Sequence, residues 1–97
     1  MAIAMDELTV NWEDEQGRKT TKELDKRLIS KGGAWITVFF LYQDMNLQTG
    51  EYGPPKGRIQ RYQKRNDRYM PQSKFNISSA KQALEIAGII NEWFGGE

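Results

Sequence analysis

The hydrophobic pattern is densest between residues 34 and 44, where β-branched and aromatic side chains follow one another almost without a break. This composition is typical of a β-strand. Alternation along the strand divides the segment into two faces, with Ile36, Val38, Phe40 and Tyr42 on one and Trp35, Thr37, Phe39 and Leu41 on the other. Because both sets are largely apolar, the pattern predicts a central strand that is covered on each side.

A loop and two further extended segments follow this strand. Residues 46–55 contain two glycines and two adjacent prolines, which indicates a long loop. Residues 57–65 and 68–77 are predicted to be strands, and Asn66-Asp67 is predicted to form the hairpin turn between them, because both residues tolerate tight turn geometry. Pro71 cannot donate a hydrogen bond to a ladder, so it is expected at a sheet edge or at a bulge.

The first thirty residues give a weaker pattern. Leu8 to Trp12 alternates as a strand would. In residues 18–30, the spacing of Leu24 and Leu28 fits one face of a helix, and the same stretch also alternates as a strand does. Periodicity does not separate the two structures here, and we favour the strand.

These elements predict an α+β fold, with a four-stranded antiparallel sheet followed by one C-terminal amphipathic helix. The length of 97 residues fits a single domain over residues 1–97. Residues 1–5 are expected to be disordered.

The C-terminal helix has the clearest signals. Ser79 is the predicted N-cap, with Gln82 completing a capping-box pattern, and Gly95-Gly96 ends a helix of about sixteen residues. Its apolar stripe fits packing across the sheet, which is the favoured interpretation, or a homodimer formed through the helix. Gly88 within the helix would permit a close approach of a second helix. The candidate dimer-interface residues are Gly88, Ile90, Trp93 and Phe94.

Composition limits the chemistry that the chain can perform. The sequence contains no cysteine and no histidine, which excludes disulfides, thiolate or imidazole metal sites and His-dependent triads. No spacing of carboxylates indicates an acid–base pair or a metal site. We therefore expect a protein that is not an enzyme, with no catalytic residues, no metal and no cofactor. The longest apolar run, Trp35 to Tyr42, is too short to span a bilayer, and the N-terminus lacks a signal-peptide pattern, so a cytoplasmic location without a membrane partner is expected.

Charge is concentrated in one segment. The formal net charge is only +1, but residues 56–74 contain seven lysines and arginines against Asp67 alone, while the segments on either side are acidic. Such an asymmetry predicts a polyanionic partner. On the proposed hairpin, alternation places Arg58, Gln60, Tyr62 and Lys64 on one face, Ile59, Arg61, Gln63 and Arg65 on the other, and Tyr69, Phe75 and Ile77 together.

Cations interleaved with aromatic rings on extended strands are typical of single-stranded nucleic-acid binding, because the cations contact phosphates and the rings stack on unpaired bases. The predicted phosphate contacts are Arg58, Arg61, Lys64, Arg65, Arg68 and Lys74, and the predicted stacking residues are Tyr62 and Tyr69, with Trp35 a weaker candidate. Two alternatives stay open. The charges could protect edge strands from aggregation, or the hairpin could belong to a non-catalytic interaction module that docks an acidic protein.

Residues 57–90 resemble the C-terminal domain of the transcriptional coactivator positive cofactor four and its bacterial relatives. The similarity lies in Ile59-Gln60-Arg61-Tyr62, Tyr69-Met70-Pro71, Lys74 and Phe75-Asn76-Ile77-Ser78, which leads into the helix. It implies four antiparallel strands and a helix, dimerisation and single-stranded DNA binding in transcription or DNA maintenance, with DNA contacts from Arg58, Arg61, Tyr62, Lys64, Arg65, Arg68 and Lys74. Phe75 replaces the glycine that is usual in the family. Purine-rich-element-binding repeats and Whirly-type proteins share this order of elements and this class of ligand, so which of these families the chain resembles most stays open. The sequence also leaves open whether the ligand is DNA or RNA.

Overall fold

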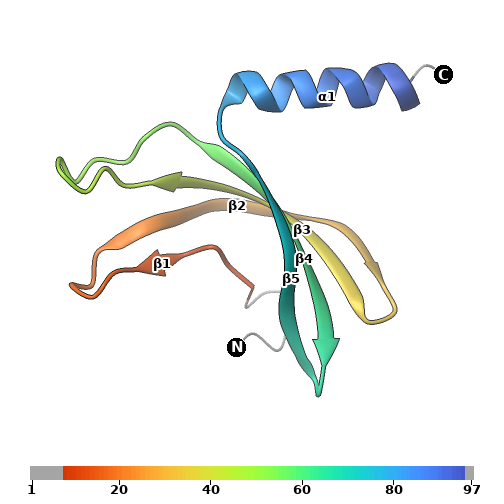
Figure 1. Ribbon diagram of the computed structural model, residues 1–97, viewed down its shortest axis with the longest axis horizontal. Coiled ribbons are helices and arrows are strands. Elements are labelled where there is room, and N and C mark those ends of the chain that lie inside the picture. The colour runs from red at the N-terminus through yellow and green to blue at the C-terminus, as the bar shows by residue number, and fades with distance from the viewer. Residues whose placement is uncertain (1–7, 96–97) are drawn as a thin grey trace.

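The structure is a computed structural model that describes residues 8–95; the expected disorder of residues 1–5 lies outside the described residues. Its elements are β1 (Trp12–Glu13), β2 (Lys19–Gly32), β3 (Trp35–Asp44), β4 (Lys56–Arg65), β5 (Arg68–Ile77) and α1 (Ala80–Phe94). The strands form one antiparallel sheet in the order β1-β2-β3-β4-β5, so every strand pairs with its neighbour in sequence (Figure 1). The α+β class is confirmed.

The sheet has five strands where four were predicted. Residues 18–30 do form a strand, as favoured, within the fourteen residues of β2. The additional strand is β1, in which Trp12 pairs with Thr21 and a bulge follows. The alternating pattern of residues 8–12 is therefore a real signal of one-sided burial, although only its last residue joins the sheet.

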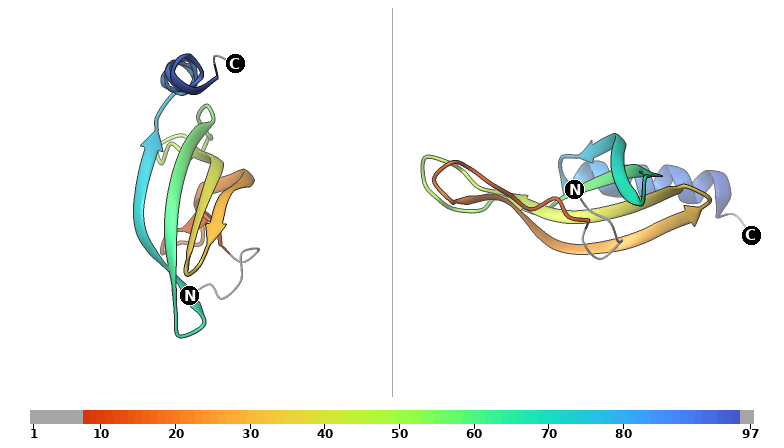
Figure 2. Two further views of the ribbon diagram at one scale, coloured as in Figure 1. Left: turned by 90° about the vertical axis from the view of Figure 1, so that its right-hand side faces the viewer. Right: turned by 90° about the horizontal axis from the view of Figure 1, so that it is seen from below.

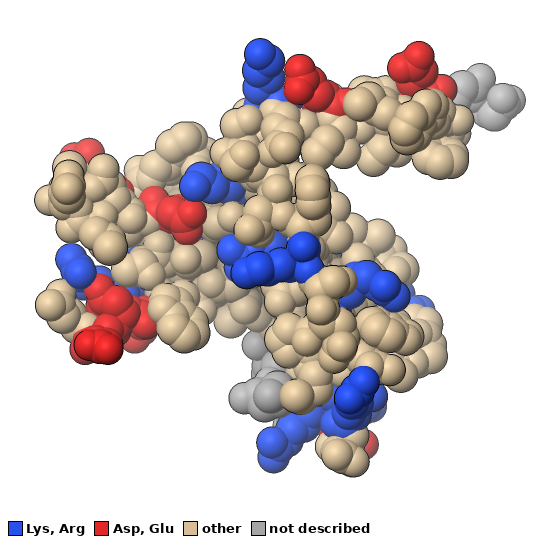
Figure 3. All heavy atoms as spheres, viewed as in Figure 1, with Lys and Arg blue, Asp and Glu red and all other residues tan. Residues whose placement is uncertain are grey.

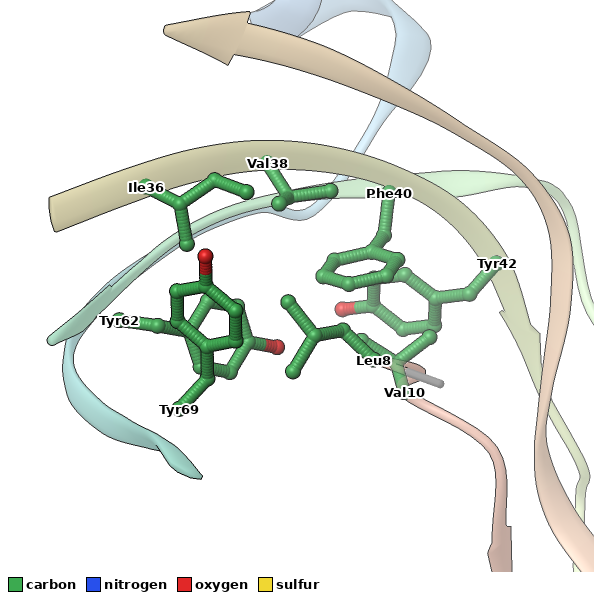
Figure 4. Close-up of a cluster of buried hydrophobic side chains, with 8 residues drawn as sticks. All are labelled: Leu8, Val10, Ile36, Val38, Phe40, Tyr42, Tyr62 and Tyr69. Atoms are coloured by element: carbon green, nitrogen blue, oxygen red, sulfur yellow. The ribbon is translucent and has the colours of Figure 1, made fainter. Parts of the chain in front are cut away.

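The strand β3 lies at the centre of the sheet, as predicted, but only one of its faces is fully buried. Ile36, Val38 and Phe40 are completely buried on that side. Leu8 and Val10 lie over it, as Figure 4 shows. We call this side the covered face; its sheet residues are Ile36, Val38, Phe40, Tyr42, Tyr62 and Tyr69.

The opposite side, which we call the open face, is covered only in part, where Ile77 of β5 is 3% exposed, and this corrects the expectation of a strand buried on both sides. Leu41 is 42% exposed there, and Phe75 of β5 is 52% exposed. Figure 2 shows a thin, curved sheet with α1 beyond one end. The two faces of the sheet therefore have different surroundings despite their similar apolar composition.

The turns follow the predicted chemistry. Asn66 and Asp67 both have positive φ, 52° and 64°, as a two-residue type I′ hairpin turn requires. The loop over residues 46–55 is confirmed, and it is organised by Asn46, whose side chain accepts a hydrogen bond from the Gln48 N–H at 2.9 Å. A β-bridge between Met45 and Tyr52 closes its base.

A bulge in β5 changes which side chains share a face. Tyr62 pairs with Pro71 whereas Arg61 pairs with Ser73, so one extra residue, Gln72, is inserted into β5. Tyr69 therefore lies on the covered face, while Phe75 and Ile77 lie on the open face, contrary to the predicted grouping. Pro71 lies at this bulge on an edge strand, as expected.

The helix α1 forms as predicted but does not pack across the sheet. The Ser79 hydroxyl accepts a hydrogen bond from the Gln82 N–H at 3.1 Å, and the Gly95 N–H donates to the Asn91 carbonyl at 2.8 Å. No residue of α1 is buried, so the favoured interpretation of its stripe is wrong for the single chain.

The buried phenol of Tyr62 is expected to lower the stability of the fold at alkaline pH. Burial raises its pKa from 10.0 to about 12, against the opposing effect of the nearby Arg58 charge. In the unfolded chain the phenol ionises near pH 10, whereas in the folded protein it stays protonated up to about pH 12. The free energy of unfolding is therefore unaffected by this group below pH 10, and it falls by up to about 1.4 kcal/mol per pH unit as the pH rises from 10 towards 12. We expect urea denaturation to show a steeper loss of stability between pH 9 and pH 12 for the native chain than for Tyr62→Phe. Equal slopes would contradict the shift.

Candidate nucleic-acid interface

The basic segment forms the β4–β5 hairpin, and its charges are largely uncompensated. Of its seven cationic side chains, only Lys56 forms an ion pair within residues 8–95, with Asp44 at 3.1 Å. The other ion pairs found there are Arg18–Asp14, in the β1–β2 turn, and Arg27–Asp25, within β2. The cations of the segment that have no carboxylate partner among the described residues are Arg58, Arg61, Lys64, Arg65, Arg68 and Lys74.

The register divides the predicted contact residues between the two faces. Arg61 is opposite Thr37 and Arg65 is opposite Arg68, which places these three arginines on the open face. Arg58 is opposite Phe40 and Lys74 is opposite Gln60, which places them on the covered face together with Lys64. The predicted alternation along β4 is confirmed, and it means that the eight residues do not form one continuous surface.

On the open face, an aromatic ring and the arginines lie together. The Arg61 guanidinium carbon is 4.3 Å from the centre of the Trp35 ring. Trp35 pairs with Gln63 across the β3–β4 ladder. The Gln63 side-chain oxygen accepts hydrogen bonds from Arg65 Nε and Nη2, at 3.1 and 2.8 Å. We call the set Trp35, Arg61, Gln63, Arg65 and Arg68 the open-face site.

The hairpin end of this site holds two like charges directly opposite each other. Arg65 and Arg68 are Cα partners on either side of the Asn66-Asp67 turn. Such a pair destabilises a sheet. A bound anion between the two guanidinium groups would relieve the repulsion.

The two tyrosines predicted to stack on bases lie in the core. Tyr62 is 4% exposed and Tyr69 is 8% exposed, and both belong to the cluster beneath Leu8 and Val10. Neither ring presents a free face to solvent in this structure. Trp35, the weaker candidate, is half-buried on the open face and is the ring that the arginines accompany.

The sequence analysis missed a basic contribution from β2. The β2–β3 turn lies beside the start of the β4–β5 hairpin, because the Lys64 N–H donates to the Ala34 carbonyl at 2.6 Å. Lys31, near the end of β2, therefore lies at the basic end of the sheet. The position of Lys31 just before Gly32-Gly33, at the start of a turn, is the only signal that could have suggested this.

Acidic side chains gather elsewhere. Figure 3 shows red side chains grouped at the β1–β2 turn and blue side chains towards the β4–β5 turn. In the β1–β2 turn, Asp14 accepts hydrogen bonds from the Arg18 N–H and the Gln16 N–H, both at 2.9 Å. The backbone hydrogen bond from Arg18 is the main reason that the pKa of the Asp14 carboxyl lies below its ordinary value. This carboxylate is thus engaged within its own turn.

Other kinds of site have no support in the part of the chain that the structure describes. Residues 8–95 contain no group of three or more acidic side chains placed to hold a metal ion. Among the same residues, no helix has both the length and the apolar character needed to cross a membrane.

The like-charge pair has a measurable cost. We expect Arg68→Thr to stabilise the fold by about 0.2–1 kcal/mol at low salt, because it removes the repulsion with Arg65. The electrostatic part of this gain should disappear at high salt, where screening is strong. Urea denaturation at both salt concentrations measures it, with Arg18→Thr as the control, since that change removes an ion pair. A destabilised Arg68→Thr protein at low salt would contradict the interpretation.

Comparisons of the chain with protein-family models, with curated proteins and with solved structures each find no match. The candidate interface therefore rests on the register, the contacts and the charges described above.

Proposed function

We propose that the chain binds single-stranded nucleic acid with little sequence preference, as an accessory factor in transcription or DNA maintenance. The observation that carries this proposal is the open-face site, where the Trp35 ring lies 4.3 Å from a guanidinium that has no carboxylate partner among the described residues. Arginines bind phosphates, and both indole and guanidinium planes accept a stacked base. Neither contact depends on base identity.

The shape of the site favours an unpaired strand. Trp35 lies on an extended strand within a sheet, and its ring can stack only on a base that is not already paired and stacked in a duplex. The single helix is a poor reader of a duplex groove, because its polar face carries Lys81 against Glu85 and Glu92. A single strand is therefore the ligand that uses both the ring and the charges.

Reversing the open-face charges tests the proposal. We expect Arg61→Glu/Arg65→Glu to weaken binding of a labelled oligo-dT by at least tenfold, because two phosphate contacts become repulsions. The slope of log affinity against log salt should also become shallower by about 1.4, since each contact with a single strand contributes about 0.7. Fluorescence anisotropy over a salt series measures both quantities. Arg18→Glu, which reverses an exposed charge in the β1–β2 turn, is the control and should bind as the native chain does.

Each outcome distinguishes between functions. Unchanged affinity in the double variant would remove the open-face site from the proposal. If neither oligo-dT nor oligo-rU binds the native chain at low salt, nucleic-acid binding is wrong, and the alternative of an acidic protein partner is the one to test. If the native chain binds a duplex more tightly than a single strand of equal length, the preference for single strands is wrong, and the hairpin would instead bind a groove of the duplex.

The proposal includes a homodimer formed through α1. Its apolar side chains are solvent-exposed, including Trp93 at 72% and Phe94 at 78%, and the position of Gly88 is open. At the base of α1, an apolar groove of about 270 Å³ lies between Leu41 of β3 and Leu84. The helix is about 22 Å long, so antiparallel pairing would bring the terminal aromatics of each copy to the groove of the other.

Symmetry and charge support the second copy as the occupant of this surface. The same two patches would meet twice across a two-fold axis, as a closed dimer requires. Lys81 in the first turn of one helix would also approach Glu92 in the last turn of the other. The proposed interface residues remain Gly88, Ile90, Trp93 and Phe94.

Dimerisation can be tested by sedimentation. We expect the native chain to be a dimer at tens of micromolar, and Ile90→Glu/Trp93→Glu to be a monomer with unchanged sheet structure, because two charges would be buried in the interface. Glu85→Gln on the polar face is the control and should remain dimeric. A native chain that is strictly monomeric at this concentration would refute the dimer.

A further inference from the structure

The covered face is rich in aromatic rings but has only a thin cover. Phe40, Tyr42, Tyr62 and Tyr69 lie side by side there, as Figure 4 shows. The described residues that cover them from outside the strands are Leu8 and Val10, which are 2% and 6% exposed. We call residues 8–11 the strap.

The strap is hydrogen-bonded to β2, which lies along one of its sides. It precedes the first ladder pair, Trp12 with Thr21, and contributes no strand residue of its own. Three hydrogen bonds join it to β2. The Asn11 side-chain oxygen accepts from the Glu23 N–H at 2.7 Å, the Thr9 hydroxyl donates to Glu23 at 2.5 Å, and Lys26 Nζ donates to the Leu8 carbonyl at 2.7 Å. Over the rings of β3, β4 and β5 it rests on apolar contacts.

Cations line the β4–β5 side of these rings. The Arg58 guanidinium carbon is 4.9 Å from the centre of the Tyr42 ring, and Lys64 Nζ is 6.0 Å from the centre of the Tyr69 ring. Lys74 lies on the same face, opposite Gln60. Aromatic rings bordered by phosphate-binding cations are the combination that holds unpaired bases. Because β5 is an edge strand, a flexible strand could pass around it from the open face.

We propose that the covered face is a second binding surface for unpaired bases, and that the strap occupies it when no nucleic acid is bound. This inference rests on the proposed function and adds a competition to it: the strap and the ligand exclude each other above Tyr62 and Tyr69. The apparent affinity for a single strand is then lowered by the fraction of molecules whose strap is closed. With the strap closed, as in this structure, Tyr62 and Tyr69 are buried. With the strap displaced, the same two rings would stack on bases, which is the role that the sequence predicts for them.

Locking the strap provides a direct test, and the absence of cysteine from the sequence makes an engineered disulfide unambiguous. In the full chain, Thr9→Cys/Glu23→Cys joins two side chains that are already in contact. We expect the oxidised protein to bind oligo-dT at least tenfold more weakly than the reduced protein. The matched control is Trp12→Cys/Thr21→Cys, which cross-links a ladder pair and leaves the strap free, and should bind equally in both states.

A second measurement uses the native chain, so its result does not depend on whether the cysteine variants fold correctly. The Glu23 N–H is bonded to the strap through Asn11, so its hydrogen exchange should accelerate when oligo-dT is added. Equal affinity of the oxidised and reduced lock, or a Glu23 N–H that exchanges no faster with ligand, would overturn the strap competition and leave the open-face site intact. Absence of binding in every form, including the native chain, would instead refute the proposed function.

Discussion

The structure depends on one constraint: a single sheet has two faces, and this chain covers only one of them. Leu8 and Val10 close one side over a row of buried side chains. The helix α1 does not close the other, because it extends beyond the sheet and none of its residues is buried. Chains of this length bury a smaller share of their surface than larger domains do. Much of the open face and the apolar stripe of α1 are therefore left exposed in the single chain.

Charge follows the same division. Carboxylates pair with cations in the β1–β2 turn, within β2, and between the end of β3 and Lys56 at the start of β4. The remaining cations of β4 and β5 lack such partners among the described residues, and two arginines are opposite each other at the hairpin end. This arrangement opposes stability, and a bound polyanion, as proposed above, would relieve the repulsion. Protection of a sheet edge would not require arginines on the inner strand β4.

Local features of the fold could be predicted from the sequence, whereas features that depend on distant contacts could not. The Asn66-Asp67 turn and the Ser79 cap follow from their own side chains and their immediate neighbours. The grouping of Tyr69 with Phe75 failed because the bulge at Gln72 reverses the alternation, and the sequence does not specify where that extra residue falls. The packing of α1 failed because an amphipathic stripe identifies a face to be buried without identifying what buries it.

The candidate site shows the same limit more sharply. The concentration of basic residues on one hairpin was visible in the sequence, and so was the presence of aromatic rings among them. Whether a ring is free to stack depends on Leu8 and Val10, which are remote in sequence from Tyr62 and Tyr69. As a result, the open-face arginines and part of Trp35 are accessible in this conformation, while the tyrosines are accessible only if the strap moves. Under the proposed function, electrostatic attraction would therefore act first, and stacking on Tyr62 and Tyr69 would follow only after the strap has moved.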